Sequence, residues 1–405
     1  MIKIIVLFAL MISVYTTINA KEKIVKQLTT DQKLAEFDSL FIQLKDVFPY
    51  FGVNERRHGV DWLANYQLYR DKIAHTSNDK EYLAQIDSIM RDLNSVHADI
   101  YPTRAYKYYL HAYRFANMLT FGAFKGYTRE LRKSVAKENY SYWQALYKEL
   151  HPPKVKTDLN LKEDPNVRCE LNEDSSIAVI KIKSFDFELK KTDKDVILGF
   201  YNQLDGYKNL IIDIQGNGGG FSGYWQDVLV PFLSDTTITY KGNLAYKDTP
   251  KLLNFIKADK NGEEYHLDSI QYPKLPPEVI HDNYAFSTLD FNIKPDKKSA
   301  NYKGNIYLLV DHNNYSSTEA FVNFCKVTGF ATVVGETTGG DGIGSDPFMF
   351  TLPISGIVVR YPAIMGLNPD GSSNDEFGTT PDIILNGSSK SERFKELNDY
   401  IMNHN

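Results

Sequence analysis

The N-terminal quarter of the chain repeats apolar residues at spacings of three and four positions. Two sets show this spacing: Leu34, Phe37, Leu40, Phe41 and Leu44, and then Tyr82, Leu83, Ile86, Ile89 and Leu93. Because this period is that of an amphipathic helix, the pattern predicts helices between residue 30 and about residue 96. Asn78 and Asp79 have the residue types of a helix N-terminus and predict the start of the second helical segment.

The helical pattern continues from residue 104 to residue 150, in a stretch that is rich in Tyr and Arg. Pro152, Pro153 and the charged stretch from Lys154 to Asp164 then interrupt it. Proline punctuates helices, so this second part predicts a helical insertion followed by a linker.

From about residue 169 the pattern changes to short runs of β-branched and aliphatic residues. Four runs read as strands: Ile177–Ile182, Leu210–Ile214, Ile306–Val310 and the shorter Thr332–Val334. A helix-like segment, Tyr224–Leu233, lies between the second and third runs. Strands that alternate with helical segments predict an α/β core with substantial parallel pairing.

Two further features belong to this core. A polar excursion of roughly residues 240–303 is too long for a structureless loop, so we expect a functional cover or an inserted subdomain. The runs Met349–Leu352 and Ile357–Tyr361, on either side of Ser355 and Gly356, predict a hairpin that closes the region.

The first twenty residues have the pattern of a cleavable secretory signal. Lys3 supplies a positive charge, Ile4 to Ile12 form an unbroken apolar run, and a short polar stretch ends at Ala20. The run is too short to span a bilayer, which needs ~20 residues. We therefore expect cleavage after Ala20 and a secreted or periplasmic protein without an integral membrane segment; the alternative is an N-terminal core strand.

Charge and cysteine content exclude several classes of protein. The chain has 46 Lys and Arg residues against 51 Asp and Glu residues, so it lacks the basic excess that nucleic acid requires. Its two cysteines, Cys169 and Cys325, cannot form a disulfide framework or a four-thiolate metal site. Cys325 lies in an apolar helical pattern, which predicts a buried free thiol. The 27 Tyr and 23 Phe residues favour aromatic walls for a substrate groove.

Candidate chemistry begins where the second predicted strand ends. The sequence there is Asp213-Ile-Gln-Gly-Asn-Gly-Gly-Gly220, with three consecutive glycines. Glycines without Cβ atoms let backbone N–H groups approach a ligand, so this loop is suited to hold phosphate or to form half of an oxyanion hole. It lacks the Gly-Lys-Ser/Thr of a phosphate-binding loop. The alternative is a tight turn without a ligand.

The second candidate segment follows the third predicted strand. Ser316 and Ser317 open a predicted helix in the sequence Tyr-Ser-Ser-Thr-Glu319. A hydroxyl at a helix N-terminus lies beside unpaired N–H groups and the positive end of the helix dipole, which suits a nucleophile. The alternative is a capping box in which Ser316 binds the amide of Glu319.

Together these segments resemble the tail-specific (C-terminal-processing) serine peptidases. The resemblance rests on four ordered motifs: Asn217-Gly-Gly-Gly220, Ser316-Ser-Thr-Glu319, Gly335-Glu-Thr-Thr-Gly-Gly340 and Gly378-Thr-Thr-Pro-Asp382. It implies that Ser316 is the nucleophile and that amides of Gly218, Gly219 and Ser317 form the oxyanion hole. One branch of the family uses a lysine 25 residues after the nucleophile, but that position here is Asp341. A Ser–Lys dyad is therefore absent.

The tricorn and interphotoreceptor retinoid-binding-protein-like branch supplies a different base. Leu93-Asn-Ser-Val-His97 resembles its Leu-x-x-x-His motif, which makes His97 the implied general base. The alternative is a surface or capping histidine. The branch also places an orienting carboxylate before the closing motif, where the sequence offers Asp375 and Glu376. We favour Asp375 by position, and Glu376 matches the family in side-chain length; an acidic solvated turn is the alternative for both.

The resemblance implies an α/β fold with a crotonase-like (ClpP/crotonase ββα) core and an N-terminal helical domain. We expect a signal peptide (1–20), an N-terminal helical domain (21–100), a helical insertion and linker without a PDZ domain (101–168), and a peptidase core (169–400) that carries the inserted segment 240–303. The expected partner is a peptide or protein substrate, hydrolysed by a serine endopeptidase that needs no metal or cofactor. A catalytically silent binding protein on the same fold and a serine esterase or amidase are the alternatives.

Overall fold

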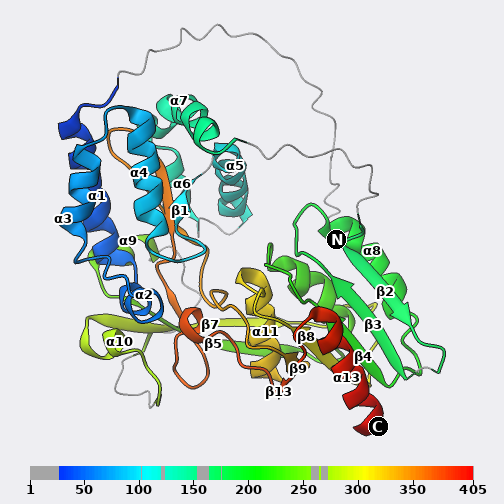
Figure 1. Cartoon of the computed structure of the whole chain (residues 1–405). Coiled ribbons are helices and arrows are strands. Elements are labelled where there is room, and N and C mark those ends of the chain that lie inside the picture. Colours follow the sequence, from blue (N-terminus) through cyan, green and yellow to red (C-terminus); the bar gives the residue numbers. More distant parts are fainter. Residues whose placement is uncertain are drawn as a thin grey trace, which may run out of the picture.

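The computed structural model describes residues 27–101, 103–119, 124–152, 164–174, 176–256, 264–265 and 272–404. The predicted signal peptide, residues 1–20, lies outside the described residues. None of the helices within these ranges has the length and apolar content needed to cross a bilayer. Figure 1 shows a group of helices beside a six-stranded sheet, with the C-terminal helix packed on that sheet.

Four helices form the first part of the chain, as the spacing predicts. They are α1 (Thr30–Val47), α2 (Phe51–His58), α3 (Tyr66–Ala74) and α4 (Asp79–Arg91). The predicted cap is confirmed, because the Glu81 amide donates to Asn78 Oδ1 at 2.9 Å and so satisfies an otherwise unpaired helix N–H group. The predicted apolar positions Phe37, Leu40, Ile86 and Ile89 are buried.

The predicted helical insertion contains α5 (Thr103–Leu119), α6 (Lys125–Leu131) and α7 (Ser134–Leu150). These helices share one hydrophobic core with α1–α4 and with strands from the far end of the chain. The described residues between 103 and 152 contain no strand. The domain boundaries themselves stay a prediction.

The six-stranded sheet contains all four of the strands that the sequence predicts in this region. Its order is β13 (Ile383–Ile384), β9 (Thr332–Gly335), β8 (Asn305–Val310), β4 (Asn209–Asp213), β3 (Ile177–Ile182) and β2 (Val167–Leu171). Only the β2–β3 pair is antiparallel among these neighbours. The predicted parallel α/β core is therefore confirmed.

Alternation along the strands divides the sheet into two buried faces. Ala178, Ile180 and Ile182 pack into one core, whereas Ile177 and Val179 pack into another, because successive strand side chains point to opposite faces. The first face is covered by α8 (Lys190–Tyr201), by a π-helical and 3₁₀ segment (Trp225–Leu229 and Val230–Phe232) and by α11 (Ser316–Thr328). The second is covered by α13 (Lys390–His404), which Figure 1 shows in red. Cys325 is fully buried in α11, as the pattern predicts.

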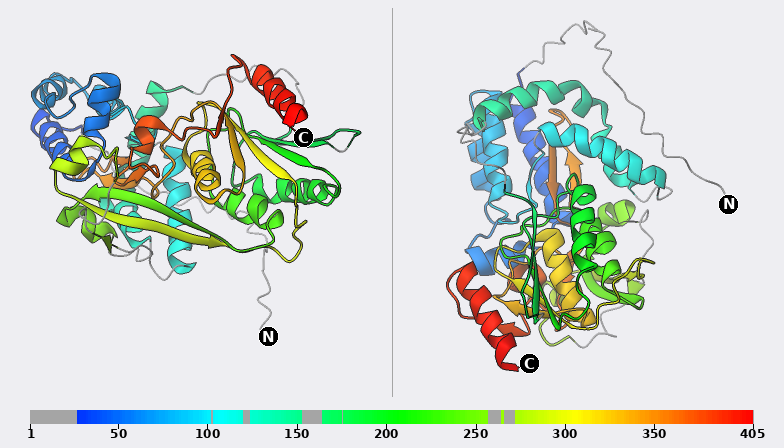
Figure 2. Two further views of the ribbon diagram at one scale, coloured as in Figure 1. Left: turned by 90° about the horizontal axis from the view of Figure 1, so that it is seen from below. Right: turned by 90° about the vertical axis from the view of Figure 1, so that its right-hand side faces the viewer.

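The polar excursion is an inserted subdomain, not a loop. Its strands β5 (Ile238–Lys247) and β7 (Tyr284–Ile293) pair antiparallel over ten residues, with β12 (Met365–Leu367) and β6 (Glu264–Tyr265) at the edges. Helices α9 (Pro250–Ile256) and α10 (Pro277–His281) lie between the long strands in sequence. Figure 2 shows this long pair reaching from the six-stranded sheet toward the N-terminal helices. Ala245 and Tyr246 of β5 and Phe286 of β7 join the core of those helices, so the excursion connects the two parts.

A small third sheet also joins the two parts of the molecule. The predicted hairpin is confirmed as β10 (Phe348–Thr351) and β11 (Val358–Tyr361). The very short strand β1 (Asp99–Ile100), which the sequence pattern does not predict, pairs with β11. This pairing fixes the end of the N-terminal helical region, including His97, against the C-terminal part of the chain.

Candidate active site

Three loops meet at one edge of the six-stranded sheet. Strands β4, β8 and β9 are neighbours and run parallel, so their carboxyl ends lie at the same edge. The loops that follow them contain Gly218, Ser316 and Asp341. Ligands bind at the carboxyl ends of strands in open α/β sheets for this reason. The topology therefore brings Gly218 together with Ser316, 98 positions later, and with Asp341, 123 positions later.

The glycine loop lies directly against the predicted nucleophile. Gly219 has φ +106°, and a Cβ atom there would stand 2.8 Å from Tyr315 O and 2.9 Å from Ser316 Cβ. Contacts below 3.0 Å are too close for a real Cβ atom, so only glycine fits. Glycine at position 219 is thus needed for a close approach of two backbones.

Two asparagines connect the glycine loop to the segment around Ser316 by hydrogen bonds. Asn217 Oδ1 accepts from the Gly219 amide at 3.0 Å and from Thr318 Oγ1 at 2.9 Å. Asn314 Nδ2 donates to the carbonyl oxygens of Ile214 (2.7 Å) and Asn217 (3.1 Å). Both asparagines are fully buried, so these bonds are shielded from water.

The same bonds distinguish the three predicted oxyanion donors. The Gly219 amide is engaged by Asn217, so it is not free to receive an oxyanion. Among the described residues no backbone hydrogen bond engages the amides of Gly218 or Ser317. A Cβ atom at Gly218 would meet nothing within 4 Å, which means that open space lies beside this amide. The amides of Gly218 and Ser317 remain as the pair that can donate hydrogen bonds to an oxyanion.

Ser316 has a strained backbone and does not cap its helix. It is the first residue of α11 and has φ +55°, a conformation that costs a non-glycine residue about 1–3 kcal/mol. The N-cap residue is Tyr315, no side chain caps this helix, and the Glu319 amide bonds to Tyr315 O at 3.3 Å. The capping box proposed as the alternative is therefore not found, and the Ser316 hydroxyl is not engaged in capping α11.

The Asp341 loop packs on the other side of Ser316. The Gly339 amide donates to Asn314 O at 3.0 Å, and Tyr315 forms a parallel bridge with Gly340. A Cβ atom at Gly342 would be 2.2 Å from Ser316 O, so the backbones touch there as well. Asp341 lies between these contacts and has φ +57°. Ser316 and Asp341 are two of the four non-glycine residues with positive φ in the described chain.

His97 reaches this edge from the N-terminal region. Its Nδ1 lies 2.8 Å from Asp341 Oδ2, and its side chain is 19% exposed. Two residues later, Asp99 forms a bidentate pair with Arg360, at 2.8 Å and 2.9 Å, and this pair anchors the short strand β1 on β11. His97 is therefore held from both sides and is not a surface or capping histidine.

The environment of His97 shifts its protonation toward the charged form. Burial lowers the pKa of His97, but the charge and the hydrogen bond of Asp341 outweigh burial, so its pKa is raised above the usual 6.5. An ionised carboxylate only accepts hydrogen bonds, which places the proton of the neutral ring on Nδ1. Nε2, for which we find no partner within the described chain, then carries the lone pair that a general base needs.

Neither of the carboxylates predicted to orient His97 makes that contact. Glu376 instead pairs with Arg56, which also pairs with Glu278 of α10. Asp375 is buried, and burial together with the nearby charge of Asp341 raises the pKa of Asp375 well above its usual value. A buried carboxyl whose pKa is raised takes up charge less readily, so it is poorly suited to hold an imidazolium. Both residues lie in the short helix α12 (Asn374–Phe377).

Asp341 occupies the place that sequence reasoning assigned to Asp375 or Glu376. Asp341 lies 25 residues after Ser316 in the sequence. That position served only to show that the lysine of the Ser–Lys dyad is absent. A glycine-flanked acid beside the nucleophile motif is the signal that was available. Its pairing with His97 depends on a contact across 244 residues, which local pattern does not reveal.

Glu319 ties the nucleophile helix to the closing motif. Its Oε1 accepts from Asn374 Nδ2 and from Thr379 Oγ1, both at 2.6 Å, and complete burial raises its pKa to about 7. Its Oε2 is buried and has no partner among the described residues. This glutamate therefore supports the position of α11.

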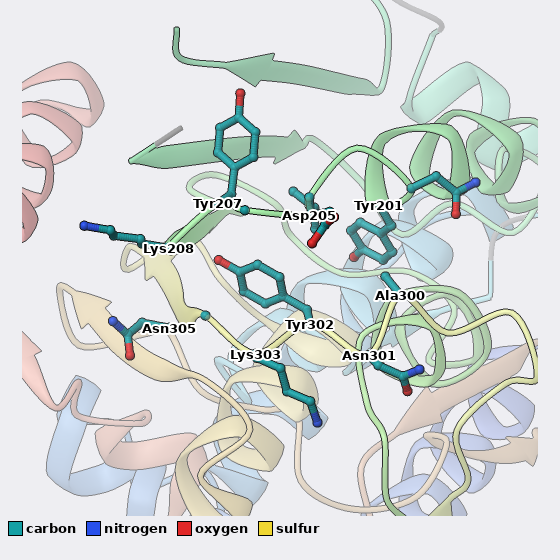
Figure 3. A pocket seen from close by; sticks show the side chains of 13 residues that line it. Tyr201, Asp205, Tyr207, Lys208, Ala300, Asn301, Tyr302, Lys303 and Asn305 are labelled. Atoms are coloured by element: carbon teal, nitrogen blue, oxygen red, sulfur yellow. The ribbon is translucent and has the colours of Figure 1, made fainter. Parts of the chain in front are cut away.

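Other features of the described chain lie away from this edge. A cavity of about 680 Å³ is lined by Tyr201, Tyr207 and Tyr302, which Figure 3 shows around it. It adjoins the residues before β4 and β8, whereas Gly218 and Ser316 follow those strands, so it lies ~17 Å or more from Ser316. In the part of the chain that the structure describes, no group of three or more His, Cys, Asp or Glu side chains could hold a metal ion.

Comparison with known proteins gives the family. The model of peptidase family S41 matches residues 176–385, just over half of the 405 residues. This chain belongs to peptidase family S41, which includes the tail-specific serine peptidases. The match contains Gly218, Ser316 and Asp341, whereas His97 lies outside it. A search of curated proteins found no match.

Solved structures agree with this S41 fold. A candidate peptidase from Parabacteroides merdae ATCC 43184 is 17% identical, covering 91% of this chain and 96% of its own, with a TM-score of 0.55. Mature CPAF complexed with lactacystin is 13% identical, covering 92% of this chain and 97% of its own, with a TM-score of 0.53. These likenesses confirm the α/β fold with its N-terminal helical region. Membership of peptidase family S41 makes this chain a serine peptidase.

Proposed function

We propose that this S41 peptidase is an exported endopeptidase that uses Ser316 as nucleophile, His97 as general base and Asp341 as the carboxylate that orients His97. The observation that carries the proposal is the 2.8 Å contact between His97 and Asp341, in a loop that packs on Ser316. It supports the histidine-dependent branch of the family, and in this chain an aspartate stands where the Ser–Lys branch has its lysine. Export rests on the signal-like pattern of Lys3 and the apolar run from Ile4 to Ile12.

The first half of the reaction forms an acyl-enzyme. His97 Nε2 removes the proton from Ser316 Oγ while Oγ attacks the carbonyl carbon of the scissile peptide bond. The carbonyl oxygen becomes an oxyanion, which the amides of Gly218 and Ser317 stabilise. Loss of one such donor costs about 3 kcal/mol in serine hydrolases. The protonated His97 then gives its proton to the leaving amine nitrogen, and the carbon–nitrogen bond breaks.

The second half restores the enzyme. Water enters, His97 takes one of its protons, and the resulting hydroxide attacks the acyl carbon. Ser316 Oγ leaves and recovers its proton from His97, which releases the new carboxyl terminus. Asp341 stays ionised throughout and stabilises the imidazolium that forms in each half.

A fluorophosphonate probe tests this proposal on the purified protein. Such a probe phosphonylates an activated serine, so Ser316→Ala should abolish labelling and His97→Ala should slow it by several orders of magnitude. Ser134→Ala is the matched control, because Ser134 is also the first residue of a helix but lies exposed on α7. It should label as the wild type does.

The outcomes separate the candidate functions. Labelling that survives Ser316→Ala would exclude Ser316 as nucleophile. Absence of labelling in the wild type would favour the silent binding protein. Where labelling depends on Ser316, turnover of a peptide library supports an endopeptidase, whereas turnover of esters alone would favour the esterase.

A further inference from the structure

Large apolar side chains gather on the surface beside the glycine loop. Phe221 directly follows Gly220 and is 41% exposed, and Phe187 is 55% exposed. Their rings contact each other edge to face, with centroids 5.2 Å apart. Exposed contiguous aromatic patches usually mark binding sites, because water does not favour them.

The backbone holds this aromatic pair at a fixed distance from the nucleophile. The Phe185 amide donates to Gly219 O at 3.1 Å, and the Phe221 amide donates to Phe185 O at 2.8 Å. The segment that carries Phe187 therefore runs beside the glycine loop. Gly219 touches Ser316, and Phe221 is two residues further on, so its Cα lies within ~8 Å of the Gly219 Cα.

Helix α5 carries another exposed ring on the side of His97. Tyr108 is 48% exposed. Ring contacts connect Tyr108 to Tyr109 (5.0 Å) and Tyr109 to Tyr101 (5.1 Å). Arg360, which anchors Asp99 near His97, lies over the Tyr101 ring.

We propose that Phe187 and Phe221 form a subsite for a large apolar side chain of the peptide substrate, located within about three residues of the scissile bond. The distance follows from the ~3.3 Å that an extended peptide advances per residue. The occupant is the substrate itself, because the patch is continuous with the glycine loop that touches Ser316. This inference rests on the proposed function and specifies its substrate class.

Matched peptide pairs test the subsite. Each pair differs only by Phe or Ala at one position, and the position is moved through three residues on either side of the scissile bond. The wild type should prefer Phe by about tenfold in kcat/KM at one of these positions. Phe221→Ala and Phe187→Ala should bring that ratio close to one, mainly by lowering turnover of the Phe peptide, and Phe221→Leu should retain most of the preference.

Controls keep the subsite and the proposed function separable. Ile42→Ala, which removes an exposed apolar side chain on α1, should leave the ratio unchanged. Fluorophosphonate labelling of Ser316 should persist in every variant, which shows that each one folds. An equal Phe-to-Ala ratio in wild type and variants would overturn the subsite while the proposed function stands. A change in oligomeric state of Phe221→Ala would also overturn it, by assigning the patch to contact between copies of the chain.

Discussion

His97 Nδ1 and Asp341 Oδ2 lie 2.8 Å apart although 244 residues separate them in the chain. This contact joins the end of the N-terminal helical region to the loop that packs on Ser316. It also accounts for the aspartate at the position where the Ser–Lys branch has its lysine.

Asp341→Asn should lower kcat/KM at neutral pH by about 100-fold or more, because the neutral amide neither stabilises the imidazolium nor fixes the ring tautomer. His97 must be unprotonated to act, so activity rises as pH increases through its pKa. The Asp341 charge raises that pKa, and its loss should move the acid limb of the pH–rate profile to lower pH. An unshifted limb would mean that His97 is not the titrating base.

Arg360→Gln should move the acid limb of the pH–rate profile in the direction opposite to Asp341→Asn. The Arg360 charge lowers the pKa of His97, and its removal also leaves the Asp99 charge, which raises that pKa, without its partner. The acid limb should therefore move to higher pH. Measuring kcat/KM between pH 5 and 9 for both variants distinguishes this electrostatic effect from simple damage to β1, which would lower the rate without moving the limb.

Glu376→Gln and Asp375→Asn should each leave kcat/KM within a few-fold of the wild type. Glu376 is paired with Arg56, and Asp375 is buried with a raised pKa, so neither supplies the charge that holds His97. Parallel kinetics with Asp341→Asn provide the comparison. A 100-fold loss of kcat/KM in either variant, with fluorophosphonate labelling intact, would mean that a carboxylate of α12 orients His97.

Gly219→Ala should reduce kcat/KM by about 100-fold, because the new methyl group would press on Ser316 Cβ and displace the oxyanion amides. Gly206→Ala is the matched control. Gly206 also has positive φ (+83°), but a Cβ atom there meets nothing within 4 Å. It should lose only the stability that backbone strain costs. Equal activity in the two variants would contradict the close approach.

Glu319→Gln should remove part of the pH dependence of stability. The pKa of Glu319 is about 7 in the folded protein, above the usual 4.5, so its contribution to stability is complete below pH 4.5 and is lost as pH rises through 7. The variant should therefore gain stability relative to the wild type between pH 5 and pH 8. Urea unfolding at both pH values measures this, with the exposed Glu55→Gln as control.

Periodicity anticipated the strands of the parallel core and the helices of the N-terminal region, because each is stabilised by its own apolar face. It did not anticipate β5 and β7, in which polar residues alternate with apolar ones in an otherwise polar segment, nor the two-residue strand β1. Such strands depend on partners that are distant in sequence.

The family motifs, the turn that contains Ser316 and the glycine loop can be read from the chain alone, since each is a local arrangement of residues after a strand. Which acid faces His97 follows only from the fold. Asp341, Asp375 and Glu376 are all carboxylic acids, so residue type does not distinguish them. The order of the parallel strands and the β1–β11 pairing bring Asp341 to His97. The physical reason is that charge acts through space over a few ångströms, whereas a sequence records only neighbours along the chain.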